Sequence, residues 1–239
     1  MLATVATSMM KGFDVRELAS LFAKPLPRPM DVPNLLDPAD EAQYGIYGLT
    51  VAPLLKAAGA KVLWNGVLCR MVYGQRQSWK LFIVRYPSHR HFLAMISNPY
   101  YFRINKFREK GVERFEASFT TPSIPHDNLS RHKTMVGVHF NRDGHSSQLD
   151  AVREVFKDSA GELAYANKET SPMTFLTRPR KIDPNPLTYK ELAMISFPDA
   201  VTADEELEGG LIDRLKDALG EDFACHRYTR KSLRSMLKL

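Results

Sequence analysis

The chain has 239 residues, 44% of them hydrophobic, which is enough to bury the core of one large domain or of two modules of about 100 residues each. No apolar run approaches the roughly 18 residues of a membrane-spanning helix, and the N-terminus MLATVATSMMKGF lacks a secretory signal pattern, so we expect a cytoplasmic protein with no membrane partner. The net charge is +6 but the basic residues are spread along the chain, and Cys69 and Cys225 form no metal-binding pair, so we expect neither a nucleic-acid partner nor a metal site.

The first elements are a short helix and a proline-rich lead-in. Residues 13–23 have apolar side chains at helical spacing, and the prolines of KPLPRPMDVP end this helix. Because proline cannot donate to a sheet ladder, Pro33 predicts a first strand that is short, extended or at a sheet edge. Asp37 and Pro38 then predict the start of an apolar helix that ends at Gly59.

The next segment reads as a hairpin followed by a β-α-β unit. Strands at residues 61–72 and 79–86 are joined through Gly74 into an antiparallel hairpin. The second of these strands, WKLFIVRYP, leads into a broken helix, SHRHFLAMISNPYYFRINKFREKG. The strand VERFEASFTTP then returns to the sheet, so this part of the chain predicts a compact α+β module.

The second half repeats the same order of elements after a polar joint, SIPHDNLSRHK. Residues 134–140 predict a strand, and Leu149, Val152 and Phe156 mark the apolar face of a helix. Strands at residues 162–168 and 188–197 flank a long insertion, SPMTFLTRPRKIDPNP. A helix striped with leucines and a strand at residues 223–229 complete this half, in which we expect Cys225 to be a small apolar filler, as Cys69 is in the first half.

The same strand-ending and helix-starting residues occur in both halves, which indicates an internal duplication. In each half a strand ends with an aromatic residue and a proline, which a helix-capping residue follows: Tyr86, Pro87 and Ser88 in the first, and Phe197, Pro198 and Asp199 in the second. We therefore divide the chain into a lead-in of residues 1–29, a first module of residues 30–125 and a second, diverged module of residues 126–239.

A resemblance supports this division. DPADEAQYGIYGLTVAPLLKAAGAKVLWNG and VRYPSHRHFLAMISNPYYFRINKFREKGVER resemble the DUF1330 family of the dimeric α+β barrel (ferredoxin-like) superfamily, over about residues 31–122. The resemblance implies two ferredoxin-like β-α-β-β-α-β modules packed sheet to sheet, as a monomeric pseudo-dimer or in a homodimer. Ligands of this superfamily bind between the sheets or at the barrel mouth, and its members include cofactor-free monooxygenases, cyclases, isomerases and proteins without known chemistry.

Alternation along the strands predicts which polar side chains face the barrel interior. In TMVGVHF, Val136 and Val138 form a face suited to the helices, so His139 belongs to the opposite face. In LFIVRY, Arg85 shares a face with Ile83. Polar side chains inside apolar strands are costly unless they are paired, which makes them site candidates.

The candidates have both a functional and a structural interpretation. As functional residues, His139 and Glu191 are candidate catalytic groups, and the candidate substrate contacts are Arg85, Tyr86, Trp64 and Tyr165. As structural residues, His139 is a hydrogen-bonded interior histidine, Arg85 bonds a carboxylate, and Glu191 neutralises a neighbouring cation.

Two function classes therefore stay open, and neither needs a cofactor. One is an isomerase, cyclase or monooxygenase that acts without a cofactor on a small apolar or anionic substrate. The other is a non-catalytic binding or assembly protein. An open pocket reached by His139 favours the first, and a closed apolar filling favours the second.

Overall fold

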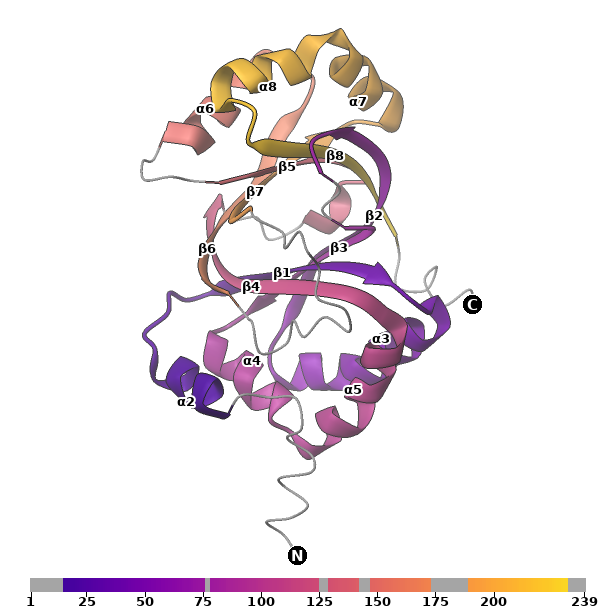
Figure 1. The fold of residues 1–239 in the computed structure, drawn as a ribbon, viewed down its shortest axis with the longest axis vertical. Coiled ribbons are helices and arrows are strands. Elements are labelled where there is room, and N and C mark those ends of the chain that lie inside the picture. The colour runs from indigo at the N-terminus through magenta and orange to yellow at the C-terminus, as the bar shows by residue number, and fades with distance from the viewer. Residues whose placement is uncertain (1–14, 76–77, 125–128, 142–146, 173–188, 232–239) are drawn as a thin grey trace, which may run out of the picture.

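Two four-stranded sheets join at their edges into one closed barrel, with helices outside it (Figure 1). The computed structural model describes residues 15–75, 78–124, 129–141, 147–172 and 189–231. The strands follow one another around the barrel in the order β1-β3-β2-β8-β5-β7-β6-β4. Every neighbouring pair of strands is antiparallel, and β4 pairs with both β6 and β1, which closes the barrel.

The two halves contain the same sequence of elements. The first half comprises α2 (Val15–Ala23), β1 (Met30–Pro38), α3 (Glu41–Ala57), β2 (Lys61–Tyr73), β3 (Lys80–Tyr86), α4 (His89–Ile96), α5 (Pro99–Gly111) and β4 (Val112–Ile124). The second half comprises a 3-10 turn (Leu129–Arg131), β5 (Thr134–Phe140), α6 (Ser147–Val155), β6 (Glu162–Pro172), β7 (Glu191–Phe197), α7 (Ala200–Glu206), a π-helical turn (Leu207–Leu211), α8 (Ile212–Leu219) and β8 (Phe223–Arg230).

The strand order is the ferredoxin-like one in both halves. The first sheet runs β4-β1-β3-β2 and the second runs β8-β5-β7-β6, so each places its fourth, first, third and second strands side by side. The second strand of each half pairs with the fourth strand of the other, as β2 with β8 and β6 with β4. The prediction of a pseudo-dimeric α+β barrel made by one chain is confirmed.

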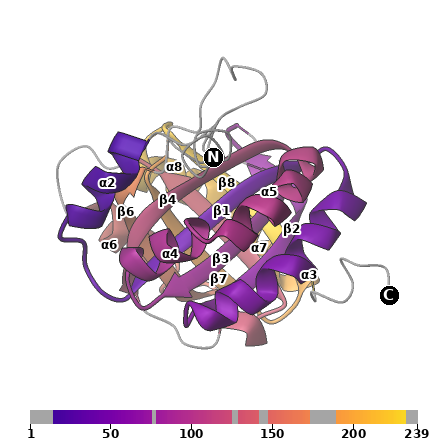
Figure 2. The ribbon, with the colours of Figure 1, turned by 90° about the horizontal axis from the view of Figure 1, so that it is seen from below.

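Four hydrophobic clusters of the described residues hold this arrangement together, and the fourth is a small one under α3. Helices α2, α3, α4 and α5 cover the outer face of the first sheet, while α6, α7 and α8 cover the second on the opposite side of the barrel (Figures 1 and 2). The outer faces contribute alternate strand residues, such as Val84 and Tyr86 of β3 or Val136 and Val138 of β5. The third cluster fills the barrel between the sheets, where Met135 of β5 packs.

The repeated proline signals mark the sheet boundaries as predicted. Strand β3 ends at Tyr86 and β7 ends at Phe197, so each following proline lies just outside the sheet. Ser88 and Asp199 are the N-caps of α4 and α7, and Asp199 accepts a hydrogen bond from the backbone N–H of Thr202. Helices α4 and α5 are the two parts of the predicted broken helix.

Of the three alternatives for the strand at Pro33, short, extended or at a sheet edge, the short and the edge strand are wrong. Strand β1 runs through Pro33 between two partners, pairing Pro33 with Ile83 of β3. Its pairing with β4 is interrupted between Asp31 and Asn34. Proline has no backbone N–H to donate, so the interruption at Pro33 avoids an unmade hydrogen bond in this ladder. An antiparallel residue gives its N–H to one neighbour only, so a central strand tolerates one proline when the other ladder stays intact.

The predicted helix start at Asp37 and Pro38 is also wrong. Both residues belong to the end of β1, and Asp40 is the N-cap of α3 because its carboxylate accepts the N–H groups of Ala42 and Gln43. The Asp37 carboxylate instead accepts the backbone N–H of Trp79, at 2.7 Å.

The remaining predictions concern the cysteines, the last helix, the long insertion and membrane-spanning segments. Cys225 is buried as expected, but Cys69 is exposed on β2 and is no core filler. The predicted last helix is interrupted at Gly209 and Gly210, which have non-helical backbone angles. The predicted insertion SPMTFLTRPRKIDPNP lies outside the described residues except for its first two residues, Ser171 and Pro172, at the end of β6. No helix in the described ranges has the length and apolar character needed to cross a membrane.

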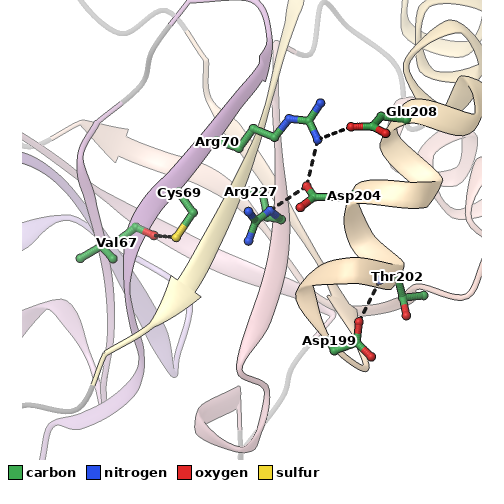
Figure 3. Close-up of polar contacts among 8 residues, drawn as sticks. All are labelled: Val67, Cys69, Arg70, Asp199, Thr202, Asp204, Glu208 and Arg227. Carbon is green, nitrogen blue, oxygen red and sulfur yellow. Dashed lines mark hydrogen bonds and ion pairs between the residues drawn. The ribbon is translucent and has the colours of Figure 1, made fainter.

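An ion-pair cluster connects β2 of the first half to the helices of the second (Figure 3). Arg70 donates to Asp204 of α7 at 3.1 Å and to Glu208 of the π-helical turn at 3.0 Å. Arg227 of β8 donates to the same oxygen of Asp204, at 3.0 Å. Arg70 and Glu208 are partly open to solvent, so we expect the cluster to orient these elements rather than to contribute much stability.

Candidate functional site

Large side chains fill most of the barrel interior. Trp64, Tyr165 and Tyr228 are fully buried there among aliphatic residues and methionines of both sheets. The Trp64 indole donates to the backbone carbonyl of His132, at 3.2 Å. A side chain at Gly66 would collide with the ring of Trp64, which explains the glycine in this strand.

A buried carboxylate lies at the centre of a polar network inside the barrel. Asp31 of β1 is fully buried and accepts two hydrogen bonds from the Arg85 guanidinium of β3, at 2.7 and 3.0 Å. The Tyr165 hydroxyl of β6 donates to the second oxygen of Asp31, at 3.0 Å, and itself accepts from Asn167 at 3.0 Å. The network therefore connects strands of both halves. The two oxygens of Asp31 accept two parallel hydrogen bonds from Arg85, the bidentate arrangement that is typical of arginine–carboxylate pairs.

Two histidines and a tyrosine form a second polar group in the interior. His139 Nε2 and the Tyr228 hydroxyl lie 3.3 Å apart, and the rings of His139 and His226 have centroids 5.9 Å apart. His226 Nε2 lies 2.9 Å from the backbone carbonyl of Gln75, so this nitrogen carries the proton. Burial first, and then the nearby His226, hold the pKa of His139 well below its usual 6.5, so the His139 ring is neutral at physiological pH.

A small cavity opens at one end of the barrel beside His139. Its volume is about 70 Å³, and residues of β1, β4, β5, β6 and β7 line it. Asn167 and Leu192 border it together with His139, while Glu116 and Glu169 stand among its polar lining residues. One water occupies roughly 30 Å³ of liquid, so the space suits a ligand of a few non-hydrogen atoms.

The acidic lining of the cavity is partly desolvated. Burial raises the pKa of Glu169 above its usual value, against the opposing effect of Lys190. Glu169 therefore takes up a proton more readily than an exposed glutamate. A neutral imidazole and a carboxyl group of raised pKa on one cavity wall can accept and donate protons within a bound molecule.

The structure brings some of the predicted site residues together and separates others. His139 and Glu191 line the same cavity, at the end of β5 and the start of β7. Arg85, Trp64 and Tyr165 are interior side chains, but none of them lines that cavity. Tyr86 lies on the helix side of the sheet with its ring against Phe92, at a centroid distance of 5.2 Å, and takes no part in the barrel interior.

Sequence reasoning missed several interior polar residues. Asp31 alternates with Pro33 and Leu35, and His226 alternates with Tyr228, so strand periodicity already contained the signal for both. Within the described ranges, no cluster of three or more histidine, cysteine or acidic residues has the arrangement of a metal site.

The chain resembles known proteins at the level of family and fold. Residues 34–117 match DUF1330, a domain of unknown function, which confirms the predicted family resemblance. A protein of unknown function from Rhodopseudomonas palustris is 27% identical over 47% of this chain and 95% of its own length, with a TM-score of 0.43.

Two further solved structures cover more of the chain at much lower identity. A candidate chlorite dismutase is 7% identical over 89% of this chain and 99% of its own, with a TM-score of 0.50, and shares the fold. An anthrone oxidase-like protein is 10% identical over 86% of this chain and 92% of its own, with a TM-score of 0.49. No curated protein matches the sequence.

Proposed function

We propose that this chain, whose residues 34–117 form a DUF1330 domain, is a small-molecule-binding protein that holds its ligand in the cavity beside His139. The observation that carries the proposal is the neutral His139 ring on the wall of a cavity that Asn167 and Glu169 also line. The remainder of the interior is filled by aromatic and aliphatic side chains and by the paired polar groups around Asp31, so this cavity is the candidate for a ligand within the described barrel.

The size and chemistry of the cavity define the class of ligand. A volume of about 70 Å³ favours a compact molecule of a few non-hydrogen atoms, far below the roughly 300 Å³ at which drug-sized pockets begin. Asn167 can donate or accept, and neutral His139 offers one nitrogen as an acceptor to a hydroxyl or an acidic C–H group. We therefore expect a small, polar, uncharged or weakly acidic molecule.

A second candidate function is proton transfer within the bound molecule. His139 has its pKa lowered and Glu169 has its pKa raised, so one can take a proton while the other supplies one. Such an enzyme would isomerise or cyclise its substrate without redox chemistry. Arg85 has no part in this proposal because its guanidinium bonds Asp31.

Filling the cavity tests the binding proposal. Ser118 lines the cavity from β4, and Ser118→Leu should displace a ligand from it without adding a charge. Ser123→Leu makes the same change at an exposed position of the same strand and is the matched control. Native mass spectrometry and extraction of the purified proteins should show a small molecule that co-purifies with the wild type and with Ser123→Leu only.

The same comparison separates binding from catalysis. His139→Gln should retain the extracted molecule if His139 is only a structural neighbour, and should lose its conversion if His139 transfers a proton. Two negative results together would contradict the binding proposal. The purified wild-type protein would carry no small molecule, and metabolite mixtures would leave the His139 ring signals in its NMR spectra unchanged, as they do with Ser118→Leu.

A further inference from the structure

A second cavity lies outside the barrel, between the outer face of the first sheet and helices α3 and α5. Its volume is about 50 Å³. Four tyrosines line it, Tyr44, Tyr47, Tyr86 and Tyr101, together with Arg108 of α5. The first sheet separates this cavity from the barrel interior, so it is independent of the site beside His139.

Arg108 is a buried cation that makes no direct contact with an anionic side chain of the described residues. Its exposed fraction is 8%, and its guanidinium lies over the ring of Phe115, 4.8 Å from the centroid. Among the described residues it makes one hydrogen bond, from Nε to Asn105 Oδ1 at 2.8 Å, and no ion pair. Asn105 in turn donates to Glu109, at 2.9 Å, so this carboxylate is bonded to the intervening amide and acts on the buried charge through space, without a direct contact.

Within the part of the chain that the structure describes, the two terminal nitrogens of Arg108 have no protein acceptor. A guanidinium has five N–H donors, and the bond to Asn105 uses the Nε–H group alone. Buried charges in proteins are normally paired, because desolvation of an isolated ion is costly. A side chain of this kind on a cavity wall therefore indicates an anion as the missing partner.

The tyrosines add neutral donors to the same cavity. Burial is the main cause that raises the pKa of Tyr44, Tyr47 and Tyr86, so these phenols keep their protons and can donate. The hydroxyls of Tyr47 and Tyr101 lie 3.4 Å apart, close enough to share one acceptor. The other walls are largely apolar.

We propose that this cavity binds a small monocarboxylate, held by the guanidinium of Arg108 and the hydroxyls of Tyr47 and Tyr101. The planar fork of arginine matches two carboxylate oxygens. One guanidinium balances one negative charge, which disfavours a phosphate dianion. The volume of about 50 Å³ is less than that of two waters at roughly 30 Å³ each, which restricts the ligand to the smallest carboxylates, formate and acetate.

Titration of the full chain with sodium formate and sodium acetate tests this proposal, with sodium chloride at equal ionic strength as the salt control. The Nε–H signal of Arg108 in nitrogen-correlated NMR spectra reports on the cavity directly. Formate or acetate should shift it in a saturable manner and chloride should not. Arg108→Lys, which keeps the charge but loses the fork, should weaken binding about tenfold or more.

Two further variants keep the experiment decisive if Arg108→Lys does not fold. Tyr47→Phe and Tyr101→Phe retain the rings and should each weaken binding about fivefold. Arg103→Lys makes the same charge-preserving change on the exposed side of α5 and should bind as the wild type does. No saturable response in the wild type, or equal affinity in the wild type and the tyrosine variants, would overturn the proposal, whatever is found for the cavity beside His139.

Discussion

Tyr165 of β6 donates a hydrogen bond to Asp31 of β1, at 3.0 Å, and both side chains are fully buried. The two residues are 134 positions apart and belong to opposite halves of the chain. Around them the two sheets meet edge to edge, since β6 pairs with β4 and β4 with β1. The barrel is thus closed by a polar contact in its interior as well as by backbone ladders at its seams.

Removing this hydroxyl should measure the strength of the contact. Tyr165→Phe leaves Asp31 bonded to Arg85 and deprives Asn167 of its acceptor, so we expect a loss of about 1–3 kcal/mol in the free energy of unfolding. Urea denaturation followed by circular dichroism gives the value. Tyr100→Phe removes a hydroxyl from an exposed ring of α5 and should change stability by less than about 0.5 kcal/mol.

The ion pair between Asp31 and Arg85 should behave as a unit. Arg85→Met leaves a buried carboxylate without its cation and should cost about 3–5 kcal/mol. The double variant Asp31→Leu, Arg85→Met removes both charges, and we expect it to be more stable than Arg85→Met alone. Additive losses in the double-mutant cycle would show instead that the two charges do not depend on each other.

The fold was predictable where the spacing of apolar residues and the prolines or capping residues indicate the same element boundary. Tyr86 and Phe197 end strands just before a proline, and their helices follow at once, so local sequence was sufficient there. It failed at Asp37, which resembles an N-cap but accepts the backbone N–H of Trp79, just before β3. That partner is 42 positions away, and no local rule identifies it.

The site was predictable only in part, for a similar reason. Alternation places His139 and Arg85 on the interior face of their strands, as the structure has them. It does not reveal partners across the barrel, so Asp31 was not recognised as the residue that bonds Arg85. Pairings of this kind depend on strand order and register, which are properties of the whole barrel.

The acid sensitivity of the fold should depend on His139. Folding lowers its pKa well below 6.5, so the unfolded chain binds a proton more readily than the folded one. Stability is therefore complete above about pH 6.5 and declines as the pH falls from there through the lowered pKa of the folded state. The pKa values of His226 and His89 are lowered too, and that of Glu169 is raised, so His139 accounts for only a part of the total slope.

His139→Gln should reduce this slope by up to about 1.4 kcal/mol per pH unit between pH 6.5 and pH 5. Chemical denaturation at several pH values measures it for the variant and the wild type in parallel. Parallel curves for His139→Gln and the wild type would show that His139 takes up its proton equally well in the folded state.

The two halves, which we propose to be modules of residues 30–125 and 126–239, should not be stable apart. A fragment of residues 1–125 retains β1 to β4 but loses the partners of β2 and β4, so both edges of its sheet are open to other chains. It also exposes the interior face that carries Leu81 and Ile83.

Size-exclusion chromatography and circular dichroism of the 1–125 fragment should show an aggregate or a self-associated dimer, in which a second copy replaces the missing half. Mixing it with a fragment of residues 126–239 should restore a one-to-one complex that elutes with the intact chain. A monomeric fragment with full helix and strand content would mean that the first sheet needs no partner, and that closure of the barrel contributes little to the stability of either half.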